Sequence, residues 1–254
     1  MTKTVEGRLG VVSDIHGNSA ALRAVLDDGA ALGVEVWLVL GDVVAMGADP
    51  GGVLGQLDEV DVLALISGNT ERYVLTGDRP DPSFEDVIAD PSELARLVEV
   101  VGSFSWTRGN LSGQGLLDPV TSWVPDHRIA LSDGSRLLAV HASLVADDGV
   151  GIHPERVDAD YRRLFPDVAA DLVVGGHTHT VTDHMVDGVR FVNPGSVSNL
   201  MTADKAARYA VIDASPAATT VEFRSVQYDV ARAVADIEQS GIPGAGFLVR
   251  HYFS

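Results

Sequence analysis

Seven side chains that could bind metal ions follow apolar, strand-like segments of the chain, each close to a glycine or a short polar residue. The first segment, Leu9–Val12, precedes Asp14 and His16, which lie two positions apart. On extended backbone such a pair points the same way, and loops that follow parallel strands meet at one edge of a sheet. We therefore expect a group of side chains to converge, namely Asp14, His16, Asp42, Asn69, His141, His177 and His179.

This set predicts two metal ions, because seven donors are too many for one tetrahedral site. The chain has no cysteine, so the ligands are nitrogen and oxygen. We expect two divalent transition-metal ions, with manganese first and iron, nickel, cobalt or zinc as alternatives. A carboxylate can bridge two metals, and Asp42 stands alone after its strand, so we expect it to be the bridge. One site is then completed by Asp14, His16 and His179, and the other by Asn69, His141 and His177.

The charge balance favours a small phosphorylated substrate. The chain has 18 Lys and Arg against 36 Asp and Glu, a formal net charge of −18. Such a surface repels nucleic acid and anionic membranes, so we expect neither as a partner. Two divalent ions bring about +4, the carboxylates Asp14 and Asp42 reduce this to roughly +2, and a bridging hydroxide reduces it to roughly +1. That local field would attract a phosphate ester, which the hydroxide would attack.

The apolar segments predict a mixed α/β chain that forms a single domain over residues 1–254. Strands and helices alternate up to Ile66, as in a parallel βαβαβ arrangement, and a second set of short strands begins at Arg128. The predicted strands are Leu9–Val12, Val34–Leu40, Val60–Ile66, Arg128–Leu131, Arg136–Val140, Asp171–Val174, Val181–Val186, Val189–Val192, Arg208–Asp213 and Thr219–Ser225.

Two segments depart from this pattern. Residues 71–126 are rich in Pro, Gly and Asp, and we expect them to form an insertion of short helical pieces over one end of the sheet, one of them starting at Asp90-Pro91. Residues 227–254 are expected to form a C-terminal helix and an apolar tail, Phe247–Phe253, which packs on the body or on another subunit of a homo-oligomer. No apolar leader and no run of transmembrane length is found, so we expect a cytoplasmic protein.

The order of these motifs resembles the signature of the calcineurin-like metallophosphoesterases. The motifs are Asp14-x-His16, Gly41-Asp42, Gly68-Asn69, His141 and Gly176-His177-x-His179. The turn Asn193-Pro194-Gly195-Ser196 resembles one seen in the small prokaryotic phosphodiesterase branch of that family. The resemblance implies a four-layer α/β/β/α sandwich with two mixed sheets, a dinuclear centre with the ligands given above, and attack on phosphorus by a metal-bridged hydroxide. Asn69 and His177 would position the metals and the phosphate.

One position departs from the family pattern. The family often has a histidine directly after Gly-Asn, whereas this chain has Thr70, followed by Glu71 and Arg72. Thr70 cannot supply a proton near neutral pH, so we expect a preference for leaving groups of low pKa, such as aryl alcohols. Arg72 either reaches a phosphate oxygen or is solvated beside Glu71.

The leading hypothesis is therefore a metal-dependent phosphodiesterase or phosphomonoesterase that acts on a small molecule. One alternative is a catalytically weak or inactive scaffold that uses the same fold to bind a partner protein. Another is a phosphoprotein phosphatase. A nuclease is disfavoured by the acidic surface, and the chain contains neither Gly-x-Ser-x-Gly nor Gly-Lys-Ser/Thr, so serine-triad hydrolases and P-loop enzymes are not supported.

Overall fold

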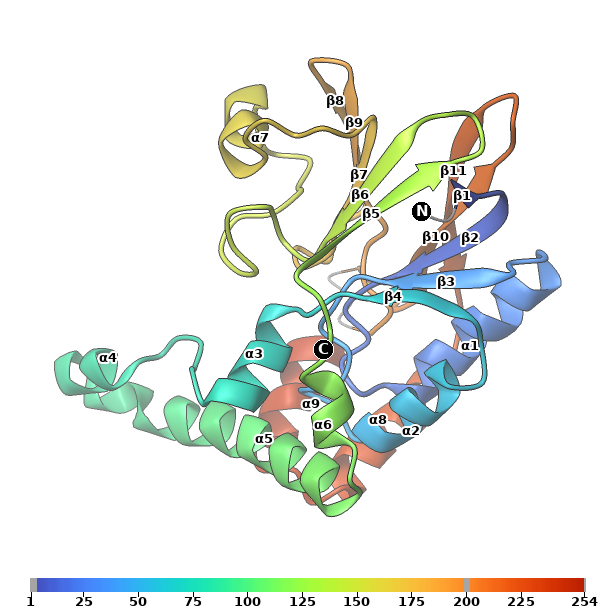
Figure 1. The fold of residues 1–254 in the computed structure, drawn as a ribbon. Coiled ribbons are helices and arrows are strands. Elements are labelled where there is room, and N and C mark those ends of the chain that lie inside the picture. The colour runs from blue at the N-terminus through green and yellow to red at the C-terminus, as the bar shows by residue number, and fades with distance from the viewer. Residues whose placement is uncertain (1–3, 199–201, 254) are drawn as a thin grey trace.

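Two β-sheets face each other between layers of helices (Figure 1). The structure is a computed structural model that describes residues 4–198 and 202–253, so that residues 1–3, 199–201 and 254 of the expected domain lie outside the described part. Both sheets contain parallel and antiparallel pairs. The predicted α/β/β/α sandwich with two mixed sheets is therefore confirmed.

The first sheet contains the strands that precede Asp14, His16, Asp42 and Asn69. Its five strands run in the order β11-β10-β2-β3-β4, with β2, β3 and β4 parallel and β10 antiparallel to both of its neighbours. The strands are β2 (Gly7–Val12), β3 (Val36–Val39), β4 (Val62–Leu65), β10 (Ala207–Ala214) and β11 (Thr219–Val226). We expected the last two strands to belong to the second set. They instead extend the first sheet, because β10 pairs with β2, a strand near the other end of the sequence.

The second sheet has six strands in the order β1-β5-β6-β7-β9-β8. The parallel strands β6 and β7 lie at its centre, and the hairpin β8–β9 completes one side. Its strands are β1 (Thr4–Val5), β5 (Asp126–Leu131), β6 (Arg136–Val140), β7 (Leu172–Val174), β8 (Thr182–Val186) and β9 (Val189–Asn193).

An apolar core fills the space between the sheets. Leu9 and Leu38 of the first sheet and Leu137 and Val174 of the second belong to one buried cluster. Alternate residues of these strands face the opposite sheet, as the two-residue period of a strand requires. The inner core therefore fixes the two sheets relative to each other, and with them the loops at their common edge.

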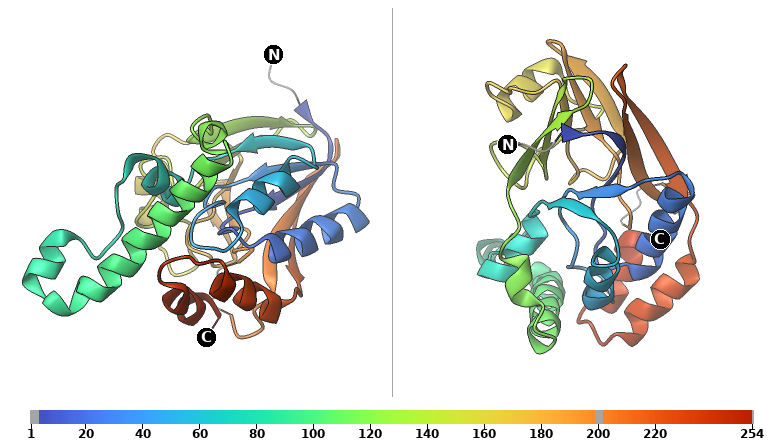
Figure 2. Two further views of the ribbon diagram at one scale, coloured as in Figure 1. Left: turned by 90° about the horizontal axis from the view of Figure 1, so that it is seen from below. Right: turned by 45° about the vertical axis from the view of Figure 1, so that its right-hand side comes forward.

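The outer helical layers are unequal in size (Figure 2). Helices α1 (Ser19–Ala31) and α2 (Pro50–Leu57) cover the outer face of the first sheet, and the side chain of Asn18 caps α1 by accepting from Ala21 N at 3.0 Å. The outer face of the second sheet carries the short helix α7 (Asp158–Leu164).

The insertion is dominated by one long helix. It contains α3 (Asn69–Thr76), α4 (Phe84–Ala89), the 3-10 turn Pro91–Glu93, the 20-residue α5 (Leu94–Gly113) and α6 (Leu117–Val120). The prediction of only short helical pieces was wrong, because α5 packs on α3 and α2 along its length. Trp106 and Trp123 are partly buried against the body, as expected of side chains that anchor an insertion.

The C-terminal segment packs on the same chain. Helices α8 (Val230–Gln239) and α9 (Ala245–Phe253) share a buried cluster in which Ile237, Leu248 and Tyr252 meet. Assembly into a homo-oligomer through this tail stays a prediction. Among the described residues, no helix combines the length and the apolar character needed to span a bilayer.

A tryptophan ring between two glycines fixes how β2 sits against β3. A Cβ atom on Gly10 or on Gly29 would overlap the indole of Trp37. We therefore expect Gly10→Ala to lower the free energy of unfolding by about 1–3 kcal/mol, the usual cost of overpacking a core. Equilibrium unfolding in urea measures this. The control is Gly55→Ala, where an added Cβ meets nothing and the free energy should stay the same or rise; equal effects of both variants would contradict this role of Gly10.

Candidate metal centre

All seven predicted ligands meet at the edge shared by the two sheets. Asp14 and His16 follow β2, Asp42 follows β3, Asn69 begins α3, His141 follows β6, and His177 and His179 follow β7. The first five are buried and the last two are partly buried. Ligands that lie 165 positions apart in sequence are thus brought into one cluster.

The backbone of this cluster is not extended. Five of the seven ligands have positive φ angles, between 48° and 67°, namely Asp14, His16, Asp42, His177 and His179. We expected Asp14 and His16 to share a direction along extended backbone, and this reason was wrong, because β2 ends at Val12. A left-handed backbone costs about 1–2 kcal/mol per non-glycine residue and persists where surrounding structure enforces it, commonly at functional sites.

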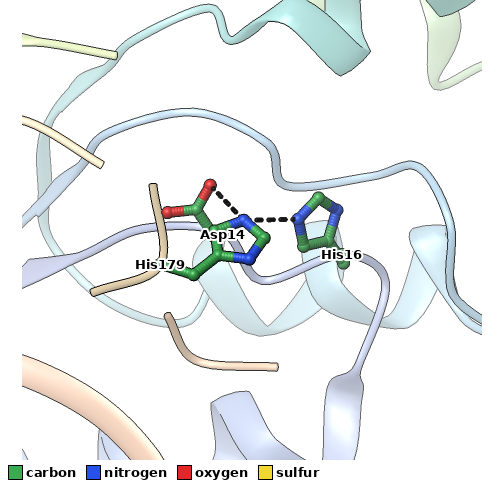
Figure 3. A group of neighbouring side chains, drawn as sticks. All are labelled: Asp14, His16 and His179. Carbon is green, nitrogen blue, oxygen red and sulfur yellow. Dashed lines mark hydrogen bonds and ion pairs between the residues drawn. The ribbon is translucent and has the colours of Figure 1, made fainter. Parts of the chain in front are cut away.

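Three of the ligands form a first group (Figure 3). His179 Nε2 lies 3.2 Å from Asp14 Oδ1 and 3.4 Å from His16 Nε2. The main-chain N–H of His177 also donates to both carboxylate oxygens of Asp14, at 3.3 and 3.1 Å. These are the three residues that the sequence assigned to one metal.

A second group consists of Asn69, His141 and His177, in which two imidazoles face the same amide oxygen. Asn69 Oδ1 lies 3.0 Å from His141 Nε2 and 3.0 Å from His177 Nδ1. Asp42 lies between the two groups, with Oδ1 at 3.3 Å from His141 Nε2 and Oδ2 at 3.9 Å from His16 Nε2. One carboxylate oxygen thus faces each group, which is the geometry that a bridging ligand requires.

Backbone carbonyls orient three of the imidazoles. His16 Nδ1 lies 3.2 Å from Ala45 O, His141 Nδ1 lies 2.6 Å from Leu40 O, and His177 Nε2 lies 3.0 Å from Gly149 O. Since a carbonyl only accepts, each of these nitrogens is the donor, and the other ring nitrogen points into the cluster. Histidine ligands of metals are held in the same way.

The charge states of the side chains suit metal ligands. Burial lowers the pKa of His16 to about 4 and also lowers the pKa of His177, so both rings are neutral near pH 7. Burial acts against ionisation of Asp42, but His141 and the other donors around it hold its pKa below the usual range. Burial also opposes a charge on His141, yet Asp42 raises the pKa of that ring to about 10. A cation at His141 would displace this proton.

The donor set fits divalent transition-metal ions. The nitrogen of neutral His177 that faces Asn69 Oδ1 carries a lone pair, and so does the Nε2 of neutral His16, which points into the cluster. Contacts between two acceptors are repulsive unless a proton or a cation lies between them. Mixed imidazole, carboxylate and amide ligands are those of Mn, Fe, Co, Ni and Zn.

Glu71 holds the loop after β3 and was not predicted. Its side chain is fully buried, and its two oxygens accept from the main-chain N–H groups of Asp42, Val43, Val44 and Gly68, at 2.8 to 3.2 Å. Burial, and then the charge of Asp42, raise its pKa to about 7. The sequence did contain a signal, because a glutamate at the third position of a helix commonly bonds back to the cap residue.

Thr70 contacts the expected bridge directly. Its main-chain N–H and its hydroxyl both donate to Asp42 Oδ1, at 3.0 and 2.9 Å. Gly68 lies so close that a Cβ there would overlap the same oxygen. The residue in the place of the family histidine thus orients a ligand.

Arg72 is surrounded by acids. Its guanidinium pairs with Asp147 at 2.8 Å, Asp148 at 2.6 Å and Asp78 at 3.0 Å. It is neither free in solvent nor paired with Glu71. Its contact with a phosphate oxygen stays a prediction.

A cavity of about 230 Å³ lies over the cluster. Ligands from both groups line it, together with Val100 and Phe104 of α5 and Phe247 and Tyr252 of α9. The ring of Tyr252 stacks on His16 with the centroids 5.7 Å apart, and its hydroxyl donates to Met46 Sδ at 3.1 Å. The insertion and the C-terminal helix therefore form walls around the candidate site.

Comparison with known proteins gives consistent matches. Residues 8–216 match the model of the calcineurin-like phosphoesterase superfamily domain. The chain is 25% identical to the uncharacterized protein MJ0912 of Methanocaldococcus jannaschii, over 94% of this chain and 95% of that one. Among solved structures, hypothetical protein PH1004 of Pyrococcus horikoshii has a TM-score of 0.78 at 18% identity, covering 97% and 98% of the two chains. A metallophosphoesterase of Sphaerobacter thermophilus has a TM-score of 0.71 at 23% identity, covering 98% of each.

The role of Glu71 can be tested with Glu71→Gln. The amide has the same shape, but its NH₂ would face two N–H donors of the loop that carries Asp42. We expect the affinity for Mn²⁺ to fall about 10- to 100-fold, as for other residues that hold metal ligands in place. Titration calorimetry of the metal-free protein measures this. Glu85→Gln, at an exposed position on α4, is the control; unchanged affinity in folded Glu71→Gln would contradict the assignment.

Proposed function

The chain belongs to the calcineurin-like phosphoesterase superfamily, and from this premise we propose that it hydrolyses a small-molecule phosphodiester or phosphomonoester. We further propose that it works with two divalent transition-metal ions, Mn²⁺ being the first candidate. The observation that carries the proposal is the position of Asp42, with one carboxylate oxygen directed to each of two ligand groups. A panel of phosphate esters, run with each metal in turn, tests it.

In this proposal the residues of the chain have separate roles. When bound, the two cations supply an activated water and positive charge for the phosphoryl oxygens. Asn69 and His177, which face each other at 3.0 Å, hold the phosphate and one cation in place. Thr70 orients Asp42, and the aromatic walls of the cavity exclude bulk water.

The cavity supports a small substrate over a phosphoprotein. Its volume of about 230 Å³ is below the roughly 300–1,000 Å³ of pockets for drug-sized ligands. Helices α5 and α9 stand beside the ligands, where a protein surface would have to approach. The scaffold alternative is less well supported, because each of the seven ligands is present and turned toward the others.

Replacing the proposed bridge tests the chemistry. In Asp42→Asn one oxygen becomes an NH₂ group that cannot bind a metal, so we expect activity on aryl phosphates to fall at least ~100-fold. Steady-state rates at saturating Mn²⁺, with metal content measured in parallel, provide the readout. The matched control is Asp58→Asn, because Asp58 is the exposed residue that directly follows α2. Near-normal turnover in Asp42→Asn would remove Asp42 from the mechanism.

The leaving-group preference is a second test. Thr70 cannot protonate a departing alkoxide near neutral pH, and its hydroxyl already donates to Asp42. We therefore expect kcat to rise as the pKa of the leaving group falls, with aryl esters turned over at least ~10-fold faster than alkyl esters. A series of substituted phenyl and alkyl phosphates measures this, and equal rates across the series would show that leaving-group protonation is supplied elsewhere.

A further inference from the structure

One face of the long helix α5 lines the cavity over the cluster. Arg96, Val100 and Phe104 recur at four-residue intervals and therefore share that face. At the rise of an α-helix they span about 12 Å. The ring of Phe104 contacts Tyr73 at 5.5 Å between centroids, and Tyr73 lies one turn after Asn69 on α3. Phe104 therefore marks the metal end of this face and Arg96 marks its outer end.

Arg96 brings positive charge to the wall of the cavity. Among the described residues that line it, Arg96 is the Lys or Arg side chain present. Its ion pair with Glu93 measures 3.7 Å, which is longer than a direct hydrogen bond. Arg72, by contrast, has three acids at 2.6 to 3.0 Å. The guanidinium of Arg96 is half exposed, with a side-chain exposure of 54%, and can donate to a ligand.

Acidic side chains lie beyond Arg96. The adjoining cavity is lined by Asp81, Asp86, Asp90, Glu93 and Arg96 itself. An anion at Arg96 on the metal side therefore shares the cavity with one of these carboxylates, Asp81, whereas one that reached further would also meet Asp86, Asp90 and Glu93. Arg96 stands at the boundary between a region that attracts anions and a region that repels them.

We propose that Arg96 binds a second anionic group of the substrate, a carboxylate or a second phosphate, at the end remote from the reacting phosphorus. The inference rests on the proposed phosphoesterase function and narrows its substrate to small esters that carry two anionic groups. Arg96 would then determine specificity without touching the reacting atoms.

Two matched pairs of probes test this assignment. The substrates are 4-carboxyphenyl phosphate and phenyl phosphate, and the non-hydrolysable ligands are 4-carboxybenzylphosphonate and benzylphosphonate. With the Mn²⁺-loaded protein we expect the carboxylate to lower KM, and the Kd of the phosphonate, about tenfold, near the lower end of what a hydrogen bond to a charged group contributes. For each pair of probes, the preference is the KM or Kd without the carboxylate divided by the value with it. In Arg96→Ala both of these ratios should fall to about one, with metal content unchanged. Arg96→Lys should keep part of the preference.

A remote cation provides the control. Arg23→Ala removes the same charge from α1, where Arg23 pairs with Glu59 at 2.7 Å, and should leave both ratios as in the wild type. Equal ratios in Arg96→Ala and wild-type protein, or no carboxylate preference in the wild type, would overturn the proposal. If the carboxylate preference in phosphonate binding depends on Arg96 but neither ester is hydrolysed with any metal, the role of Arg96 stands and the proposed hydrolase function fails.

Discussion

Oxygen and nitrogen donors that repel one another are packed together at the edge shared by the two sheets. The lone pair of His177 Nδ1 faces Asn69 Oδ1 at 3.0 Å, and the carboxylates of Asp14 and Asp42 lie within the same cluster. Side chains free to move would separate, because each buried acceptor would seek a donor. The loops after β2, β3 and β7 hold them together through left-handed backbone at five of the seven positions. A bound cation would remove the repulsion that this arrangement creates.

Buried polar contacts behind the ligands make this backbone rigid. Glu71 gathers four N–H groups of two loops, and carbonyl oxygens of the chain hold the far nitrogens of three imidazoles. The inner apolar core then keeps the first sheet and the second at a constant separation. Ligands that come from different sheets can therefore form one centre, although no local segment contains more than two of them.

The helices around the centre form walls of the cavity that lies over it. The protein as a whole is strongly acidic, yet its cavity combines prospective metal ligands with the positive charge of Arg96. Arg72, nearer to the ligands in sequence, is neutralised by three aspartates and so contributes mainly to holding α3 against the loop that follows β6. The long α5 therefore has a role in the proposed specificity as well as in packing.

The sequence by itself determined the ligand types, their order, the strands that precede them and the family they resemble, because these depend on local patterns of apolar and polar residues. Only the tertiary structure decided that β10 and β11 extend the first sheet, that α5 continues to Gly113, and that Glu71 is buried under Asp42 while Arg72 faces three acids. It also decided the left-handed backbone of the ligands. Such features depend on contacts between residues distant in sequence, which composition and spacing do not encode.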